Sequence, residues 1–184
     1  MDIKPLRQYG EHDVINLYAF GGTISTVAGS KVSKGTIVKV QGDGWKNTDE
    51  PQDMIGSVGA SYNGTVSQRY GVNAKVTLCA SGETPLGMML HSVAEVDENG
   101  ELLKFNPRKA AQMEVSVSGQ AVPILTKGIV LYKGALTDGA VAGNVAVYAT
   151  ADGELTTTAA SHVKVGKTLG AKDTDGYVLL KIEL

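Results

Sequence analysis

Six Asn-Gly or Asp-Gly pairs constrain the fold of this 184-residue chain more than any other feature, and they begin at residues 43, 63, 99, 138, 152 and 175. Such pairs favour the tight turns that join neighbouring antiparallel strands. Apolar and polar residues alternate between the turns, most clearly near the C-terminus, where one face carries Val178, Leu180, Ile182 and Leu184. Alternation with a period of two is typical of half-buried strands. The sequence therefore predicts an all-β fold of antiparallel β-barrel or sandwich units.

One short helix is expected in this β chain, at residues 106–113. Asn106 suits the capping position and Pro107 the first helical position. A weak internal repeat, offset by about 108 residues, is consistent with two related β units. It aligns residues 35–40 with 143–148, residues 55–60 with 165–171, and residues 72–78 with 178–184.

These patterns divide the chain into four parts. Residues 1–13 form an N-terminal arm, residues 14–80 an N-terminal β unit, residues 81–122 a connecting β segment with the short helix, and residues 123–184 a C-terminal β-barrel unit. The arm is polar and has no apolar face of its own, so residues 1–8 are expected to be poorly ordered in the free protein.

Composition excludes several classes of function. The net charge of −2 gives no electrostatic reason to expect a nucleic-acid partner. No apolar run approaches the roughly 20 residues of a membrane helix, so no membrane partner is expected. The start of the chain lacks the apolar core of a signal peptide, which predicts synthesis and folding in the cytoplasm of the producing cell.

No constellation of residues predicts catalysis, a metal or a cofactor. The three histidines, His12, His91 and His162, have no metal-ligand spacing. Cys79 falls on the polar face of its expected strand and is interpreted as a partly exposed structural thiol. A serine-type triad assembled by the fold stays open, although no nucleophile-elbow sequence supports it. The chain is therefore expected not to be an enzyme.

The C-terminal part resembles the small β-barrel of tailed-phage head decoration proteins, also called capsid cement proteins. The resemblance rests on residues 142–148 (AGNVAVY), 152–158 (DGELTTT), 163–166 (VKVG) and 176–184 (GYVLLKIEL). A middle block, residues 106–111 and 119–128, is similar to segments of virion structural proteins of marine tailed phages. The chain is longer than the smallest decoration proteins by an extra N-terminal half.

The resemblance implies a non-enzymatic virion structural protein that binds and stabilises the outer surface of the capsid. Its partners would be the major capsid protein and two further copies of itself in a homotrimer. The arm is the expected capsid-binding element, because strand addition to a neighbour suits Ile3, Lys4, Pro5, Leu6 and Arg7. The alternatives are another virion structural role, as a head fibre base or tail tube subunit, and a receptor- or carbohydrate-binding β module.

Overall fold

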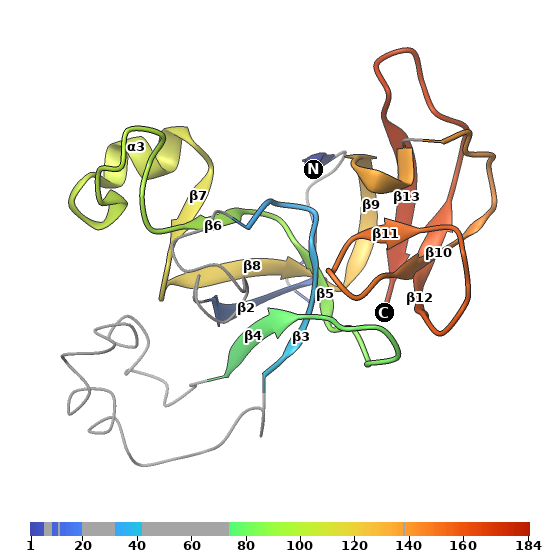
Figure 1. Cartoon of the computed structure of the whole chain (residues 1–184), viewed down its shortest axis with the longest axis horizontal. Coiled ribbons are helices and arrows are strands. Elements are labelled where there is room, and N and C mark those ends of the chain that lie inside the picture. The colour runs from blue at the N-terminus through green and yellow to red at the C-terminus, as the bar shows by residue number, and fades with distance from the viewer. Residues whose placement is uncertain (6–8, 11, 20–31, 42–73, 138) are drawn as a thin grey trace.

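The structure, a computed structural model, describes residues 1–5, 9–10, 12–19, 32–41, 74–137 and 139–184. It is mostly β with one short α-helix among these residues, so the predicted all-β fold is confirmed. The strands form a closed five-stranded barrel, a six-stranded sheet and a two-stranded sheet (Figure 1). Their bounds are β1 (Asp2–Pro5), β2 (Val14–Ala19), β3 (Ile37–Val40), β4 (Lys75–Leu78), β5 (Gly87–Met89), β6 (Ser92–Ala94), β7 (Val115–Val117), β8 (Ala121–Leu125), β9 (Lys127–Lys133), β10 (Ala146–Ala149), β11 (Leu155–Thr156), β12 (Val163–Thr168) and β13 (Val178–Glu183).

The barrel has the strand order β2-β4-β3-β5-β8 and closes because β8 pairs with both β5 and β2. Strands β2 and β4 run parallel, whereas the other neighbours in the barrel are antiparallel. Closure leaves these strands no open edge, which would otherwise offer unpaired backbone groups to another chain. One buried apolar cluster belongs to this part: Leu17, Ala19, Val32, Val38, Ala74, Val76, Met89, Val93, Val122 and Ile124.

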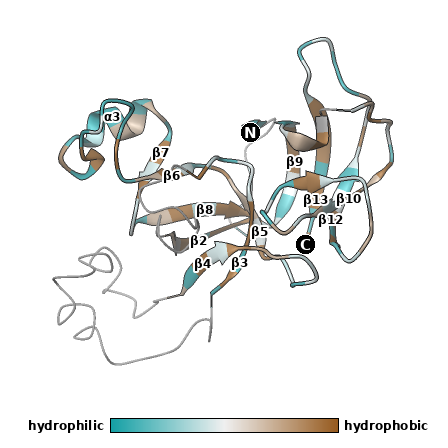
Figure 2. Cartoon of the chain, viewed as in Figure 1, coloured by the Kyte–Doolittle hydropathy of each residue, from teal (hydrophilic) through white to brown (hydrophobic). Residues whose placement is uncertain are grey.

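The six-stranded sheet is antiparallel throughout, in the order β1-β9-β13-β12-β10-β11. In β13 the side chains of Val178, Leu180 and Ile182 are fully buried, which confirms the predicted alternation. Figure 2 shows the resulting hydrophobic and hydrophilic bands along the strands. The predicted fourth member of that face, Leu184, is instead 42% exposed, because it lies beyond the last residue of β13.

The barrel and the six-stranded sheet share one hydrophobic core. The chain passes from β8 to β9 through Thr126 alone, so the two structures meet at this point. Burial of apolar side chains from both is the main favourable contribution to holding them together. The shared cluster combines residues of the barrel, the sheet and their connecting segments: Ile3, Ile37, Cys79, Met88, Leu125, Val130, Tyr132, Leu136, Val141, Val147, Ala149, Leu155, Val165, Val178, Leu180 and Ile182.

The turn between β10 and β11 packs against β3 of the barrel. The predicted Asp152-Gly153 turn is present, and the backbone N–H of Ile37 donates a hydrogen bond of 2.7 Å to the carbonyl oxygen of Gly153. Gly153 has a φ of 69°, which L residues rarely adopt. A Cβ atom there would lie 2.6 Å from the Ile37 carbonyl oxygen and 2.7 Å from Cγ2 of Thr36. Only glycine therefore fits between the hairpin and the barrel.

Between the parallel strands β6 and β7 the chain makes a helical excursion, residues 95–114. It carries a 3₁₀ turn, η2 (Leu103–Phe105), and the helix α3 (Pro107–Gln112). The predicted helix is thus confirmed, and the side chain of Asn106 caps it by accepting a 3.3 Å hydrogen bond from the N–H of Lys109. In Figure 1 the excursion projects from the barrel on the side away from the six-stranded sheet. A third buried cluster supports it: Ala94, Leu103, Ala110 and Val115.

The strand order bears on the expected boundaries and on the internal repeat. The boundary expected between residues 122 and 123 falls inside β8, which is a barrel strand. In the first half of the repeat β3 pairs directly with β4, whereas their counterparts β10 and β13 are separated by β12. Residues 55–60, the middle of the repeat, lie outside the described residues. The described strands of the two halves therefore have different neighbours, which does not support two related units.

We expect Gly153→Ala to lower the free energy of unfolding by more than the about 1–2 kcal/mol that a left-handed backbone costs an L residue, because the methyl group also meets β3. Urea denaturation measures the loss. Gly100→Ala is the control for the backbone alone, since Gly100 has a φ of 83° and no atom within 4 Å of its Cβ position. Gly170→Ala, with open space and no positive φ, should be neutral. Equal losses for the substitutions at Gly153 and Gly100 would show that the turn does not press on the barrel.

Candidate functional site

The strand β1 contains the residues that the sequence assigned to partner binding, and it is ordered within the molecule's own sheet. It pairs antiparallel with β9, with Ile3 opposite Tyr132. The side chain of Ile3 is only 3% exposed and belongs to the shared core. The expectation of a poorly ordered arm is therefore wrong for residues 2–5. An edge strand obtains its hydrogen bonds from the neighbouring strand, so one buried side chain, that of Ile3, can hold β1 without a complete apolar face.

A network of polar contacts fixes the beginning of β1. The hydroxyl of Tyr177 donates a 2.7 Å hydrogen bond to Oδ2 of Asp2. The ammonium of Lys34 lies 3.2 Å from Oδ1 of Asp2 and 2.7 Å from Oε2 of Glu114, the last residue of the excursion. The hydrogen bond from Tyr177, helped by Lys34, lowers the pKa of the Asp2 carboxyl. The hydrogen bond from Lys34 to Glu114, with a smaller contribution from Asp2, raises the pKa of Lys34. Lys34 thus connects β1 with the excursion.

The five predicted capsid-binding residues do not form one exposed surface. Ile3 is buried, and Lys4 is exposed with its ammonium 4.1 Å from the centroid of the Tyr177 ring. Pro5 pairs with β9 opposite Val130, and Leu6 and Arg7 lie outside the described residues. The buried side chain of Ile3 is therefore not available to a partner, whereas that of Lys4 is exposed.

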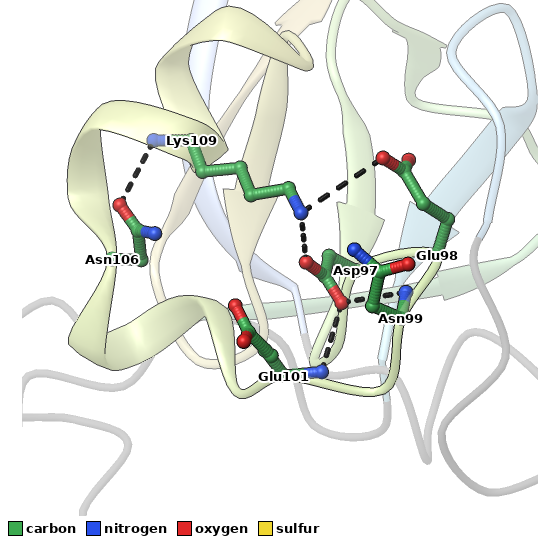
Figure 3. Close-up of polar contacts among 6 residues, drawn as sticks. All are labelled: Asp97, Glu98, Asn99, Glu101, Asn106 and Lys109. Atoms are coloured by element: carbon green, nitrogen blue, oxygen red, sulfur yellow. Dashed lines mark hydrogen bonds and ion pairs between the residues drawn. The ribbon is translucent and has the colours of Figure 1, made fainter.

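The second polar cluster surrounds Asp97 in the helical excursion (Figure 3). Oδ1 of Asp97 accepts 2.8 Å hydrogen bonds from the backbone N–H groups of Asn99 and Glu101, while Oδ2 pairs with the ammonium of Lys109. The Asp97 side chain has no exposed surface. Lys109 also lies 3.8 Å from a carboxylate oxygen of Glu98. These contacts join the Asn99-Gly100 turn to α3, so the Asp97 carboxylate has a structural role in holding the turn and the helix together.

The pKa shifts of the two partners in the Asp97–Lys109 ion pair are consistent with each other. The hydrogen bond from Lys109 lowers the pKa of the Asp97 carboxyl below its ordinary 3.8, against the effect of desolvation. The same bond raises the pKa of Lys109. Both groups therefore stay charged at neutral pH. A carboxylate held in this state is unsuited to act as a general acid.

The fold brings one serine and one histidine together. Oγ of Ser81 lies 3.0 Å from Nδ1 of His162 and 2.8 Å from Oγ of Ser161. Among the described residues no carboxylate forms a hydrogen bond or ion pair with His162, so the triad that the sequence left open lacks its acid there. The contact joins the loop after β4 in the barrel to the loop before β12 in the sheet. Its observed role is to connect these two loops.

Cys79 lies inside the shared core, so the prediction of a partly exposed thiol is wrong. Strand β4 ends at Leu78, and the alternation ends with it, which turns Cys79 inward. Burial, followed by the nearby charge of Glu83, raises the pKa of the thiol. A thiol with a raised pKa provides little thiolate, which is the nucleophilic form.

Comparison with known proteins identifies no family for the chain, because neither a family model nor a curated protein matches it. Within the described ranges, no group of three or more His, Cys, Asp or Glu side chains could hold a metal ion. No described helix is long and apolar enough to cross a membrane.

The polar clusters around Asp2 and Asp97 were not predicted from the sequence. The only local signal was the Asn99-Gly100 turn two residues after Asp97, and that turn does not specify Lys109 as the partner.

We expect Ile3→Ala to lower the free energy of unfolding by about 2–5 kcal/mol, the usual cost of truncating a buried isoleucine. Lys4→Ala is the matched control, because its side chain is exposed on the same strand and its loss should cost far less. Denaturant unfolding compares the two variants. A chain without residues 1–5 should also melt at a lower temperature, and an unchanged melting temperature would mean that β1 does not hold the sheet.

We expect Asp97→Asn to lower the Tm at neutral pH and to reduce the loss of stability in acid. The folded-state pKa is lowered, so the carboxylate contributes fully above its ordinary 3.8 and loses this contribution as the pH falls through the lower folded value. The Tm difference between wild type and variant should therefore shrink below about pH 4. Thermal unfolding at a series of pH values measures it. Glu95→Gln, at an exposed position outside the ion pair, is the control, and a constant difference down to pH 2 would contradict this role of the ion pair.

Proposed function

We propose that the protein is a non-enzymatic phage virion structural protein that binds the outer surface of the capsid and stabilises it. The observation that carries the proposal is the C-terminal stretch that resembles head decoration proteins. That stretch contributes β10, β11, β12 and β13, four of the six strands of the antiparallel sheet. The resemblance supplies the function, and the sheet is the kind of structure that the function requires.

The physical demands on a cement protein support the proposal. A capsid filled with DNA is under internal pressure, so a protein that clamps neighbouring subunits must resist deformation. Here the barrel and sheet share a core, and Lys34 connects β1 with the excursion. Many copies on a symmetric lattice would add avidity to a modest single contact. The partner is the major capsid protein.

The oligomeric state belongs to the same proposal. Three copies would suit a local threefold position of the capsid, and closed symmetry is the rule for soluble oligomers. Each chain has a mass of 19.2 kDa, so light scattering of the purified protein distinguishes one copy from three.

The decisive experiment mixes the purified protein with expanded, empty capsids assembled from the major capsid protein of the same virus. We expect the protein to sediment with the capsids, to saturate at a fixed ratio to the capsid subunit, and to raise the temperature at which the capsids disrupt. Electron micrographs of the protein alone should show no rings or tubes, which a tail tube subunit would form. Capsids that neither bind the protein nor gain stability would refute the proposal.

A further inference from the structure

Two large apolar side chains are exposed at the 3₁₀ turn η2, one just before the turn and one at its last residue. Phe105 is 76% exposed and Leu102 is 44% exposed, while Leu103 between them is buried. The N–H of Phe105 donates a hydrogen bond to the carbonyl oxygen of Leu102 at 3.1 Å. Leu102 is the extended residue before the turn, and this hydrogen bond brings its backbone close to that of Phe105, so both exposed side chains belong to the same end of the excursion. Their exposure is a cost to the free protein that no packing in the described structure offsets.

This exposure belongs to a fixed turn. Leu103 anchors the turn in the buried cluster of the excursion, and Asn106 closes it by donating its N–H to the carbonyl oxygen of Leu103 at 2.9 Å. The Asp97–Lys109 ion pair then holds α3 against the preceding loop. A backbone that is already fixed loses little further conformational entropy on binding, which favours affinity.

The charged residues nearest Phe105 in the sequence are positive. Lys104 and Arg108 are exposed on either side of Phe105 in the sequence, and residues 102–113 contain no acidic residue. The ammonium of Lys104 lies 5.0 Å from the centroid of the Phe105 ring. The carboxylates of Asp97 and Glu98 face Lys109, as Figure 3 shows, and that of Glu114 pairs with Lys34. Glu101 is exposed at the far side of Leu102 from Phe105 in the sequence. The complementary partner surface is therefore acidic around an apolar pocket.

We propose that Leu102, Lys104, Phe105 and Arg108 form a docking surface for the capsid subunit, which would receive Phe105 in an apolar pocket rimmed by carboxylates. This inference rests on the proposed function and assigns the contact to the excursion instead of β1. The excursion projects at the side of the barrel away from the six-stranded sheet, where a partner can approach it (Figure 1). Aromatic and arginine side chains in pockets dominate the affinity of many protein interfaces.

A protein pocket fits these residues better than a lipid surface does. Two basic side chains would each add only about 1 kcal/mol of attraction to an anionic membrane. One aromatic and one aliphatic side chain also bury little area in a bilayer interface, whose binding strength depends on the buried apolar area. In a protein pocket the same aromatic ring can be enclosed completely.

The test is capsid co-sedimentation with two variants and their matched controls. Phe105→Ala should weaken binding at least about tenfold, the effect expected for an interface hot spot. The double variant Lys104→Glu with Arg108→Glu should weaken binding and abolish its dependence on salt. Leu169→Ala, at an apolar residue that is 41% exposed elsewhere, and Lys164→Glu should bind like the wild type. All variants should keep the wild-type Tm, because the altered side chains are exposed.

The other outcomes each overturn the inference in a distinguishable way. If the wild type binds capsids and Phe105→Ala binds equally well, the docking surface is wrong while the proposed function stands. If the wild type does not bind, both fail. A lower oligomer mass of Phe105→Ala in light scattering would assign the surface to a second copy of the chain. Binding to vesicles of phosphatidylglycerol that Phe105→Ala abolishes would assign it to a membrane.

Discussion

The shared core between the barrel and the six-stranded sheet is the constraint on which the rest of the structure depends. Because β8 and β9 are joined by Thr126 alone, the barrel and the sheet cannot separate without exposing Leu125 and its neighbours in the cluster. Burial of apolar surface of this kind is the largest favourable term in folding. The Gly153 turn and the Ser81–His162 contact then join the barrel to the sheet through polar atoms. The excursion can carry an exposed phenylalanine because the stability of the fold does not depend on that side chain.

The sequence predicted what is encoded locally. Alternation identified β13, and an asparagine followed by a proline identified the start of α3, because the signals for strands and helix caps lie within a few residues. The all-β class followed from the same signals. Contacts between distant residues were not accessible in this way. The pairing of β1 with β9, the inward turn of Cys79 and the ion pair between Asp97 and Lys109 each depend on which segments the fold brings together.

The candidate site shows the same limit. The sequence placed the partner contact on the arm because residues 3–7 suit strand addition to a neighbour, yet Ile3 is part of the protein's own core. Leu102 and Phe105, which the structure leaves exposed, lie just before the predicted helix, in a stretch to which the sequence assigned no binding role. Burial of Leu103 decides which of these neighbours is exposed, and burial is a property of the complete fold.

The pairing of β1 with β9 has a consequence for synthesis on the ribosome. Strand β1 is translated long before its partner, since Ile3 must wait for Tyr132. At about 5–20 residues per second, this delay is on the order of ten seconds. During that time the beginning of the chain has no sheet to join, and the barrel also lacks β8, its closing strand. The closed barrel and the pairing of β1 can therefore form only after residues 121–133 have been made.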